Sequence, residues 1–160
     1  MADTSLTESD IGLLIWKASN FWQSKLRKLL NSYNLSLNEY LILRSIFYLS
    51  LLKSNIYQNE VANFIGIDIS VTSVTLKLLE KKKYITRDFK RDNRRKNIEI
   101  VKEGVNLFHI IHPLLKNEED KIFNKLNNET FNFTNSLKLI LGRKLRIKAI
   151  KKINDKPRRP

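Results

Sequence analysis

The stretch QNEVANFIGIDISVTSVTLKLLEK, residues 58–81, decides the fold, because it predicts two short helices joined by a tight turn. Apolar residues recur at the three-to-four residue spacing of an amphipathic helix over Gln58–Ile65. Gly66 suits the left-handed conformation that closes a helix, and the Asp68 carboxylate can cap the helix expected at Ile69–Lys82. Most short helix pairs are packing units, but this arrangement is also that of a helix-turn-helix, whose second helix enters the major groove of DNA.

A two-stranded hairpin is expected directly after this pair of helices. Ile85–Phe89 and Asn97–Val101 are enriched in β-branched residues and alternate partly in polarity, as short strands do. The loop KRDNRRK, residues 90–96, holds five cations and one acid where an ordinary turn has Gly, Pro or Asn. A solvated charge run is the commoner fate of such a loop. Its place after a helix-turn-helix favours contact with phosphate.

Five segments of the chain share the order and spacing of a known family. They are LSLNEYLILR (35–44), EVANFIG (60–66), LEKK (79–82), DNRR (92–95) and KEG (102–104). With the flanking helices, they resemble the multiple-antibiotic-resistance regulator (MarR) family over nearly the whole chain. Asp-x-Arg-Arg before a strand, followed by a Glu-Gly helix start, is the most specific piece. The resemblance implies a winged helix-turn-helix homodimer that binds pseudo-palindromic operators, usually as a repressor and often released by a small ligand.

The implied fold is mostly α-helical with a small β-hairpin wing. A DNA-binding domain is expected at residues 35–103. An N-terminal helix within residues 1–34 and C-terminal helices within 104–153 would form a homodimerisation domain. The apolar stripe of the first helix is too wide for one small domain to cover easily, which fits a role between subunits. Residues 154–160 are expected to be a disordered basic tail.

Base contacts are expected from one face of the second helix of the pair. One phase turns inward Ile69, Thr72, Leu76 and Leu79, and periodicity does not exclude a rival phase that turns inward Val71, Val74 and Leu78. In the first phase the base-facing residues are Ser70, Val71, Ser73, Val74 and Lys77. Their hydroxyl and methyl groups would read adenine and thymine edges, which predicts an A/T-rich operator. Phosphate contacts are expected from Lys81 and Lys82.

The wing is expected to contact DNA through Lys90, Arg91, Arg94, Arg95 and Lys96. The resemblance implies that Arg94 reaches the minor groove and that Asp92 holds the wing by pairing with a nearby arginine. Three residues depart from the family pattern. Val74 replaces a frequent arginine, Lys83 replaces the glycine that usually closes the helix, and Val101 replaces a capping threonine.

Composition limits the classes of function. The 160 residues, 42% of them hydrophobic, suffice for one compact domain with a core. The net charge of +14 favours a polyanionic partner such as double-stranded DNA. The absence of cysteine excludes disulfides, thiol catalysis and cysteine-ligated zinc. No signal peptide or transmembrane segment is recognised, so a cytoplasmic, nucleoid-associated protein is expected.

The sequence offers little for catalysis. His109 and His112 could present two imidazoles to a metal, but nothing nearby completes a ligand set, and packing near a kink caused by Pro113 explains them better. No enzyme activity, cofactor or metal is expected. Trp16, Trp22 and Tyr40 could line a pocket for a small-molecule effector, and an aromatic core explains them equally well.

Two other functions compete with operator binding. A protein this cationic could coat nucleic acid without sequence preference, as an architectural or RNA-associated factor. A membrane-surface role ranks third, because the last expected helix is basic and amphipathic. No membrane partner is expected.

Overall fold

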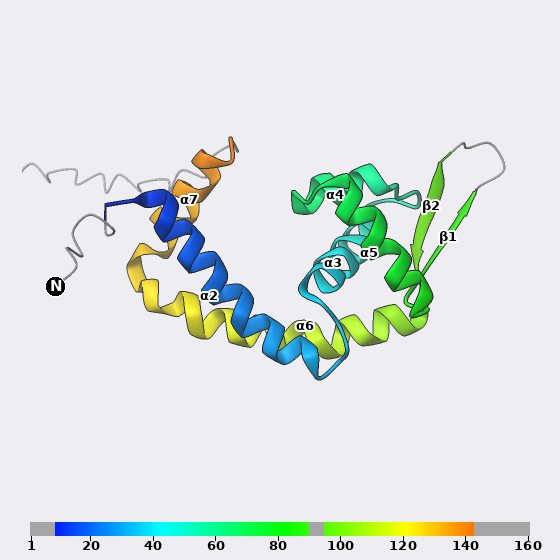
Figure 1. Ribbon diagram of the computed structural model, residues 1–160, viewed down its shortest axis with the longest axis horizontal. Coiled ribbons are helices and arrows are strands. Elements are labelled where there is room, and N and C mark those ends of the chain that lie inside the picture. The colour runs from blue at the N-terminus through cyan, green and yellow to red at the C-terminus, as the bar shows by residue number, and fades with distance from the viewer. Residues whose placement is uncertain (1–8, 90–94, 143–160) are drawn as a thin grey trace, which may run out of the picture. The chain divides into compact units, whose positions relative to one another are not determined.

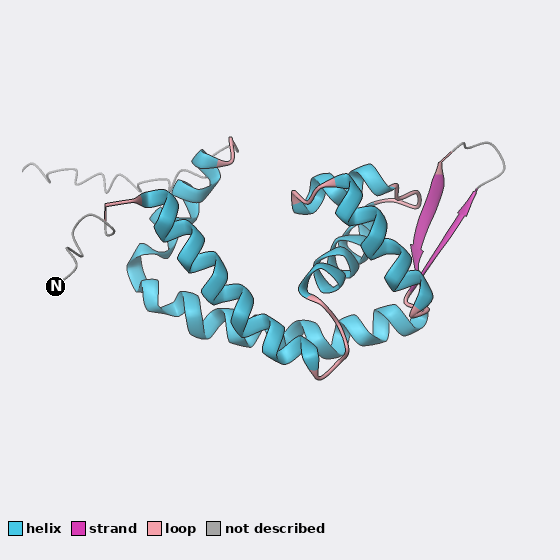
Figure 2. Ribbon diagram, viewed as in Figure 1, coloured by secondary structure: helices cyan, strands magenta, loops and turns pink. Residues whose placement is uncertain are grey.

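The structure, a computed structural model, describes residues 9–89 and 95–142 of the chain. The chain divides into two compact units, Met1–Ile122 and Phe123–Pro160. The first unit holds, in chain order, α2 (Ile11–Asn31), α3 (Leu37–Leu52), α4 (Gln58–Ile65), α5 (Ile69–Lys81), β1 (Ile85–Phe89), β2 (Lys96–Ile100) and nearly all of α6 (Lys102–Phe123) (Figure 1). The second holds the 3-10 helix η1 (Asn124–Glu129) and α7 (Thr130–Ile140). The predicted class, mostly α with one hairpin, is confirmed (Figure 2).

Helix α3 is the centre of the first unit, because it contacts α2, α4, α5 and β2. It begins with the predicted capping box: the Ser36 hydroxyl accepts from the Glu39 N–H at 3.1 Å, and the Glu39 carboxylate accepts from the Ser36 N–H at 2.8 Å. The core around it draws on every element of the unit and includes Leu26, Leu30, Ile42, Leu43, Ile46, Val61, Leu76, Leu79, Ile85, Ile98, Phe108, Ile111 and Leu115.

Three helices end with the same backbone arrangement. Asn34 after α2, Gly66 after α4 and Lys83 after α5 have φ angles of 51°, 78° and 63°. The N–H of the residue that follows each of them donates to a carbonyl five positions back, in the pairs Leu35 to Leu30 (3.2 Å), Ile67 to Ala62 (3.2 Å) and Tyr84 to Leu79 (3.0 Å). This is the Schellman closure of a helix. The role predicted for Gly66 is confirmed, and Lys83 fills a position that favours glycine.

Replacing Lys83 with glycine should therefore stabilise the fold. A residue with a Cβ costs roughly 1–2 kcal/mol in the left-handed region, and the greater freedom of glycine in the unfolded chain takes back part of the gain. We expect the free energy of unfolding, measured by chemical denaturation, to rise by about 0.5–1 kcal/mol. Lys83→Ala is the matched control, because it removes the charge and keeps the Cβ. An equal gain from both variants would assign the effect to charge instead.

The hairpin is bound to the loop in front of α4. β1 and β2 pair antiparallel, with Ile85 opposite Ile100. Beside β2, the Ile56 carbonyl accepts from the Ile98 N–H at 2.8 Å, and the Ile56 N–H donates to Oδ1 of Asn97 at 2.9 Å. Asn97 is 3% exposed. The base of the hairpin is thus joined to the segment that leads into the helix pair.

Helix α6 starts in close contact with the turn between α5 and β1. The Val101 N–H donates to the Tyr84 carbonyl at 3.1 Å. A Cβ added to Gly104 would lie 2.2 Å from the same carbonyl oxygen and 3.0 Å from Cγ1 of Ile100. Glycine is therefore required at this position by the approach of two backbone segments.

The long helix after the hairpin ends earlier than predicted. It includes Pro113 and continues beyond it. It ends at Phe123, whereas the prediction placed its end near Asn127. Asn127 has φ 44° and ψ −118° inside η1, so the predicted interruption at residues 127–129 is confirmed. The predicted basic tail lies outside the described residues.

Candidate nucleic-acid interface

Helices α4 and α5 form the predicted helix-turn-helix, with a bend of 112° between them. The Asp68 carboxylate caps α5 by accepting from the Ser70 N–H at 2.7 Å. Hydrogen bonds from the Ser70 hydroxyl and N–H lower the pKa of Asp68, which keeps this carboxylate charged at the start of the helix. Nε2 of Gln58 donates to the Ile69 carbonyl at 3.2 Å and so joins the starts of the two helices.

The burial pattern of α5 settles its phase. Thr72, Leu76 and Leu79 are completely buried, as the first predicted phase requires. The rival phase is wrong, because its inward residues Val71, Val74 and Leu78 are 38%, 59% and 44% exposed. Ile69 was also predicted to face inward and is 45% exposed, since it opens α5 ahead of the first fully buried position. Of the base-facing candidates, four are exposed and Ser73 is half-buried; the four are Ser70, Val71, Val74 and Lys77.

The structure corrects the assignment of Lys82 as a phosphate contact. Its Nζ lies 2.6 Å from Oε1 of the buried Glu39 and donates to the Asn34 carbonyl at 2.7 Å. The ammonium therefore joins the ends of α2 and α5 to the start of α3. Lys81 is exposed at the end of α5, in a position that phosphate can reach. The sequence of the three consecutive lysines, residues 81–83, does not distinguish the paired Lys82 from the exposed Lys81, because the partners of Lys82 are distant in sequence.

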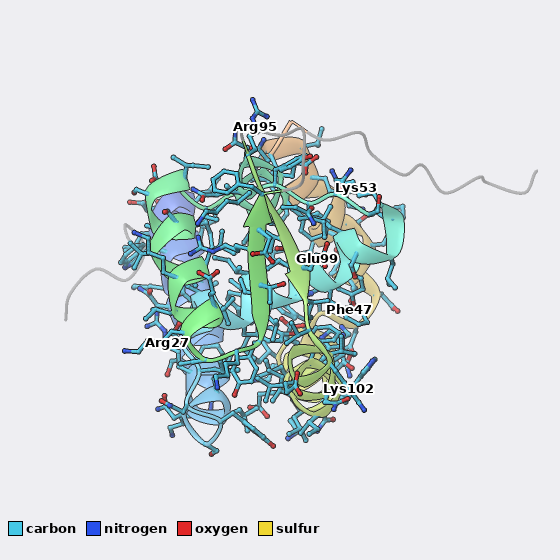
Figure 3. All side chains as sticks on the ribbon, turned by 90° about the vertical axis from the view of Figure 1, so that its right-hand side faces the viewer. Arg27, Phe47, Lys53, Arg95, Glu99 and Lys102 are labelled. Carbon is cyan, nitrogen blue, oxygen red and sulfur yellow. The ribbon has the colours of Figure 1, made fainter. Side chains whose placement is uncertain are left out.

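The described part of the wing carries three cations, Arg87, Arg95 and Lys96, and two acids, Asp88 and Glu99. Arg87 on β1 pairs with Glu80 of α5, its Nε donating to Oε2 at 3.0 Å, so this arginine braces the hairpin. Arg95 and Lys96 are exposed, and Arg95 lies at the tip of the hairpin, at the opposite end of β2 from Lys102 (Figure 3). Together with Tyr57, Gln58 and Asn59 they border a hollow of about 340 Å³. The roles predicted for Lys90, Arg91, Asp92 and Arg94 lie outside the described residues.

The three aromatic residues proposed for a ligand pocket do not converge. Trp16 is 65% exposed, because it lies on the outer side of α2. The Trp22 indole N–H donates to Oε1 of Glu119 at 3.0 Å, and the Tyr40 hydroxyl lies 2.8 Å from Nδ1 of His112. Trp22 and Tyr40 are thus parts of a polar and aromatic contact among α2, α3 and α6, and Trp16 is not.

Burial shapes the protonation of this contact. It raises the pKa of Tyr40 to about 12. Burial first, and then the positive charges of Arg44 and Lys116, lower the pKa of His112, while Glu119 acts in the opposite direction. Nε2 of His112 lies 3.4 Å from the Tyr48 hydroxyl. A neutral imidazole can accept at one nitrogen and donate at the other, so both tyrosines fit the neutral form.

The lowered pKa of His112 predicts loss of stability in mild acid. The unfolded chain takes up a proton near the ordinary pKa of 6.5, and the folded chain does so only at a lower pH. The free energy of unfolding should therefore fall as the pH drops below about 6.5, until the folded pKa is passed. Denaturation between pH 7.5 and 5 should show a steeper decline for the parent than for His112→Asn. An NMR titration midpoint at or above 6.5 for His112 would contradict this.

Two other site types have no support in the described residues. No group of three or more metal-ligating side chains lies together within residues 9–89 and 95–142. Within the same ranges no single helix is long and apolar enough to cross a membrane, and α4 with α5 meets that test only when the bent pair is counted together.

The helix pair, the hairpin that follows it and the surrounding helices define a winged helix-turn-helix protein. No protein-family model matches the chain. YdcH, an uncharacterized HTH-type transcriptional regulator of Bacillus subtilis (strain 168), is 30% identical over 84 residues. The match spans 52% of this chain and 57% of YdcH, so the chain covers little more than half of that relative's length.

The fold is that of solved MarR-family regulators. A MarR-family regulator from Rhodococcus sp. RHA1 superposes with a TM-score of 0.72 at 20% identity, over 87% of this chain and 97% of that one. MepR of S. aureus, solved with DNA, gives 0.72 at 21% identity, over 84% and 96%. CouR from Rhodococcus jostii RHA1, bound to p-coumaroyl-CoA, gives 0.69 at 21% identity, over 83% and 92%. The resemblance found in the sequence is thus confirmed at the level of fold.

Proposed function

We propose that the protein is a MarR-family transcriptional regulator that binds double-stranded DNA at a pseudo-palindromic operator, as a homodimer and as a repressor. The observation that carries this proposal is the exposed face of α5, formed by Ser70, Val71, Val74 and Lys77, in a helix pair that is followed by a hairpin with the exposed cations Arg95 and Lys96. An exposed face on the second helix of such a pair is what groove reading requires. MepR, which shares the fold, was solved as a DNA complex.

Exposed apolar side chains support the homodimer. On α2, Ile11, Leu14, Ile15 and Trp16 are 44–68% exposed, and at the end of α7 Leu139, Ile140 and Leu141 are 60–68% exposed. On each helix taken by itself, a cluster of exposed large apolar side chains favours contact with another protein surface. A two-fold dimer would place two α5 helices about 34 Å apart, one turn of duplex. Light scattering should give twice the monomer mass, and a monomer at micromolar concentration would refute the homodimer.

A competition gel shift tests operator binding. The upstream region of the protein's own gene should compete at least a hundredfold better than unrelated duplex of equal length. Near parity would instead support the alternative of a protein that coats nucleic acid without sequence preference. With roughly 6–10 phosphate contacts per dimer, log K should fall against log salt with a slope of about −0.9 per contact.

Replacing Arg94 with alanine should weaken operator binding by about 1–3 kcal/mol while leaving the dimer intact, because the motif arginine is assigned to the minor groove. Fluorescence anisotropy at moderate salt measures the change. Lys102→Ala is the matched control, since it removes an exposed cation at the far end of the hairpin (Figure 3). Equal losses of affinity in the two variants would mean that Arg94 contributes only its positive charge and makes no specific minor-groove contact.

Asp92→Ala should also weaken operator binding, although it removes a negative charge, because Asp92 is assigned to brace the wing.

Release by a small-molecule effector belongs to the same proposal. It is supported by CouR, which shares the fold and was solved with p-coumaroyl-CoA. Trp22 and Tyr40 would take part through the polar contact among α2, α3 and α6. A gel shift with added p-coumaroyl-CoA and related aromatic acids tests it, and an effector should lower the DNA affinity in proportion to its concentration.

A further inference from the structure

We infer that α5 recognises its operator through thymine methyl groups, and that Val71 and Val74 are the side chains that contact them. The inference rests on the proposed function and deepens it by naming the base atoms that are read. Thymine is the one DNA base that presents a methyl group in the major groove, so a helix that reads methyl groups selects positions of thymine.

The composition of α5 is the first support. Guanine is read in the major groove by arginine or lysine, and adenine by asparagine or glutamine. The helix, ISVTSVTLKLLEK, contains no arginine, asparagine or glutamine. Its two lysines, Lys77 and Lys81, lie in the second half, whereas the N-terminal residues of a recognition helix contact the base edges. The half that faces the bases therefore has no side chain that can make a bidentate hydrogen bond.

Three of the four hydroxyl groups of α5 donate within the protein, and the fourth, that of Ser73, belongs to a half-buried residue; this is the second support. The Ser70 hydroxyl donates to the Asp68 carboxylate, whose lowered pKa keeps it an acceptor. Oγ1 of Thr72 donates to the Asp68 carbonyl at 2.9 Å, and Oγ1 of Thr75 donates to the Val71 carbonyl at 2.8 Å. Both threonines are buried. The sequence analysis assigned base reading to hydroxyl and methyl groups together. Because these hydroxyl groups donate within the protein, the methyl groups are the main groups that remain for contact with the bases.

The third support is the exposure of the valines. Val71 and Val74 are 38% and 59% exposed and lie three positions apart, so they share one face of the helix. Leu78, 44% exposed, continues the strip. These side chains are turned away from the core that Thr72, Leu76 and Leu79 enter. An apolar strip in this position is stabilised when a base methyl group covers it.

The expected effect is a small factor at each of several positions. Removing one buried methyl-sized contact corresponds to about a fourfold change in affinity. With one thymine opposite each valine in both half-sites of a dimer, four such contacts together would contribute roughly 250-fold.

Base analogues test the inference with the full chain. An operator is first obtained by binding-site selection from random duplex. Each thymine in turn is then replaced by uracil, which removes the methyl group and keeps the hydrogen-bonding edges. We expect a loss of about fourfold at one or two positions in each half-site and no loss elsewhere. At the sensitive positions, an inosine·5-methylcytosine pair should bind about fourfold more tightly than inosine·cytosine, since these two pairs differ only in the methyl group.

Protein variants assign the methyl contacts. Val71→Ala and Val74→Ala should each remove the preference for thymine over uracil at one position per half-site, and the salt slope should not change. Leu52→Ala is the matched control: it truncates a side chain that is 77% exposed on α3 and should keep the whole preference. Specific binding with equal affinity for thymine and uracil operators would overturn the inference. A sensitive position that keeps its preference for thymine in both valine variants would overturn it too. A selection that yields no consensus would refute the proposed function itself, before any analogue is used.

Discussion

Replacing Gly104 with alanine should lower the free energy of unfolding by about 3 kcal/mol, at the upper end of what an overpacked buried site costs. The added Cβ would lie 2.2 Å from the Tyr84 carbonyl oxygen, a backbone atom that cannot turn away as a side chain can. That carbonyl also accepts from the Val101 N–H. The clash can be relieved only if α6 moves away from the turn between α5 and β1. This movement would break the hydrogen bond from Val101 and disturb the packing of Ile100.

Urea denaturation followed by circular dichroism measures this loss. Gly12→Ala is the matched control, because a Cβ at Gly12 meets only Oδ1 of Asp10 at 3.4 Å, an ordinary contact. Gly12 also lies in a helix, where alanine is favoured over glycine by up to about 1 kcal/mol. The two substitutions should thus have opposite signs. A neutral or stabilising Gly104→Ala would mean that the start of α6 yields easily.

Replacing Lys82 with methionine should cost about 2–3 kcal/mol of folding stability. The substitution keeps the apolar stem and removes the ammonium, which leaves the Glu39 carboxylate, 4% exposed in its side chain, without its cation. It also removes the donor to the Asn34 carbonyl. Breaking a fully buried pair costs roughly 3–5 kcal/mol, and the 27% exposure of Lys82 reduces that figure.

The neighbouring lysine supplies the comparison. Lys81→Met removes an equal charge from an exposed position and should change stability by less than about 0.5 kcal/mol. In DNA binding the order reverses: Lys81→Met removes one phosphate contact from each subunit of the proposed homodimer and should reduce the salt slope by about 1.8, whereas Lys82→Met should leave it unchanged. The double variant Glu39→Gln with Lys82→Met should recover at least about 1 kcal/mol relative to the sum of the single losses. Equal stability losses at Lys81 and Lys82 would contradict the pairing with Glu39.

The sequence predicted those parts of the fold that depend on local chemistry. The Ser36 and Glu39 capping box, the closure at Gly66 and the Asp68 cap each depend on residues within a few positions of one another, and all three are present. The same holds for the strands, which are displaced by at most one residue from their predicted ranges. The family resemblance also indicated that Lys83 stands where glycine is usual, and its positive φ agrees.

The errors concern side chains whose partners are far away in sequence. Lys81 and Lys82 look alike in the chain, and only the tertiary contact of Lys82 with Glu39 separates them. Trp16 was grouped with Trp22 because both are aromatic residues of one helix, but Trp22 reaches Glu119 and Trp16 remains exposed. The phase of α5 was undecided because apolar residues occur on both of its faces. Burial of Thr72 decides it, and a threonine is a weak hydrophobic signal.

The two hydrogen bonds between Ile56 and β2 restrict how the protein can adapt to different targets. They fasten the base of the hairpin to the segment that enters α4, so the hairpin and the helix pair are held together as one unit. In the proposed operator complex, this attachment would fix the number of base pairs between the major-groove and minor-groove contacts of one half-site. An operator with one base pair inserted between them would lose one set of contacts entirely. Natural targets should therefore differ in sequence at that position and not in length.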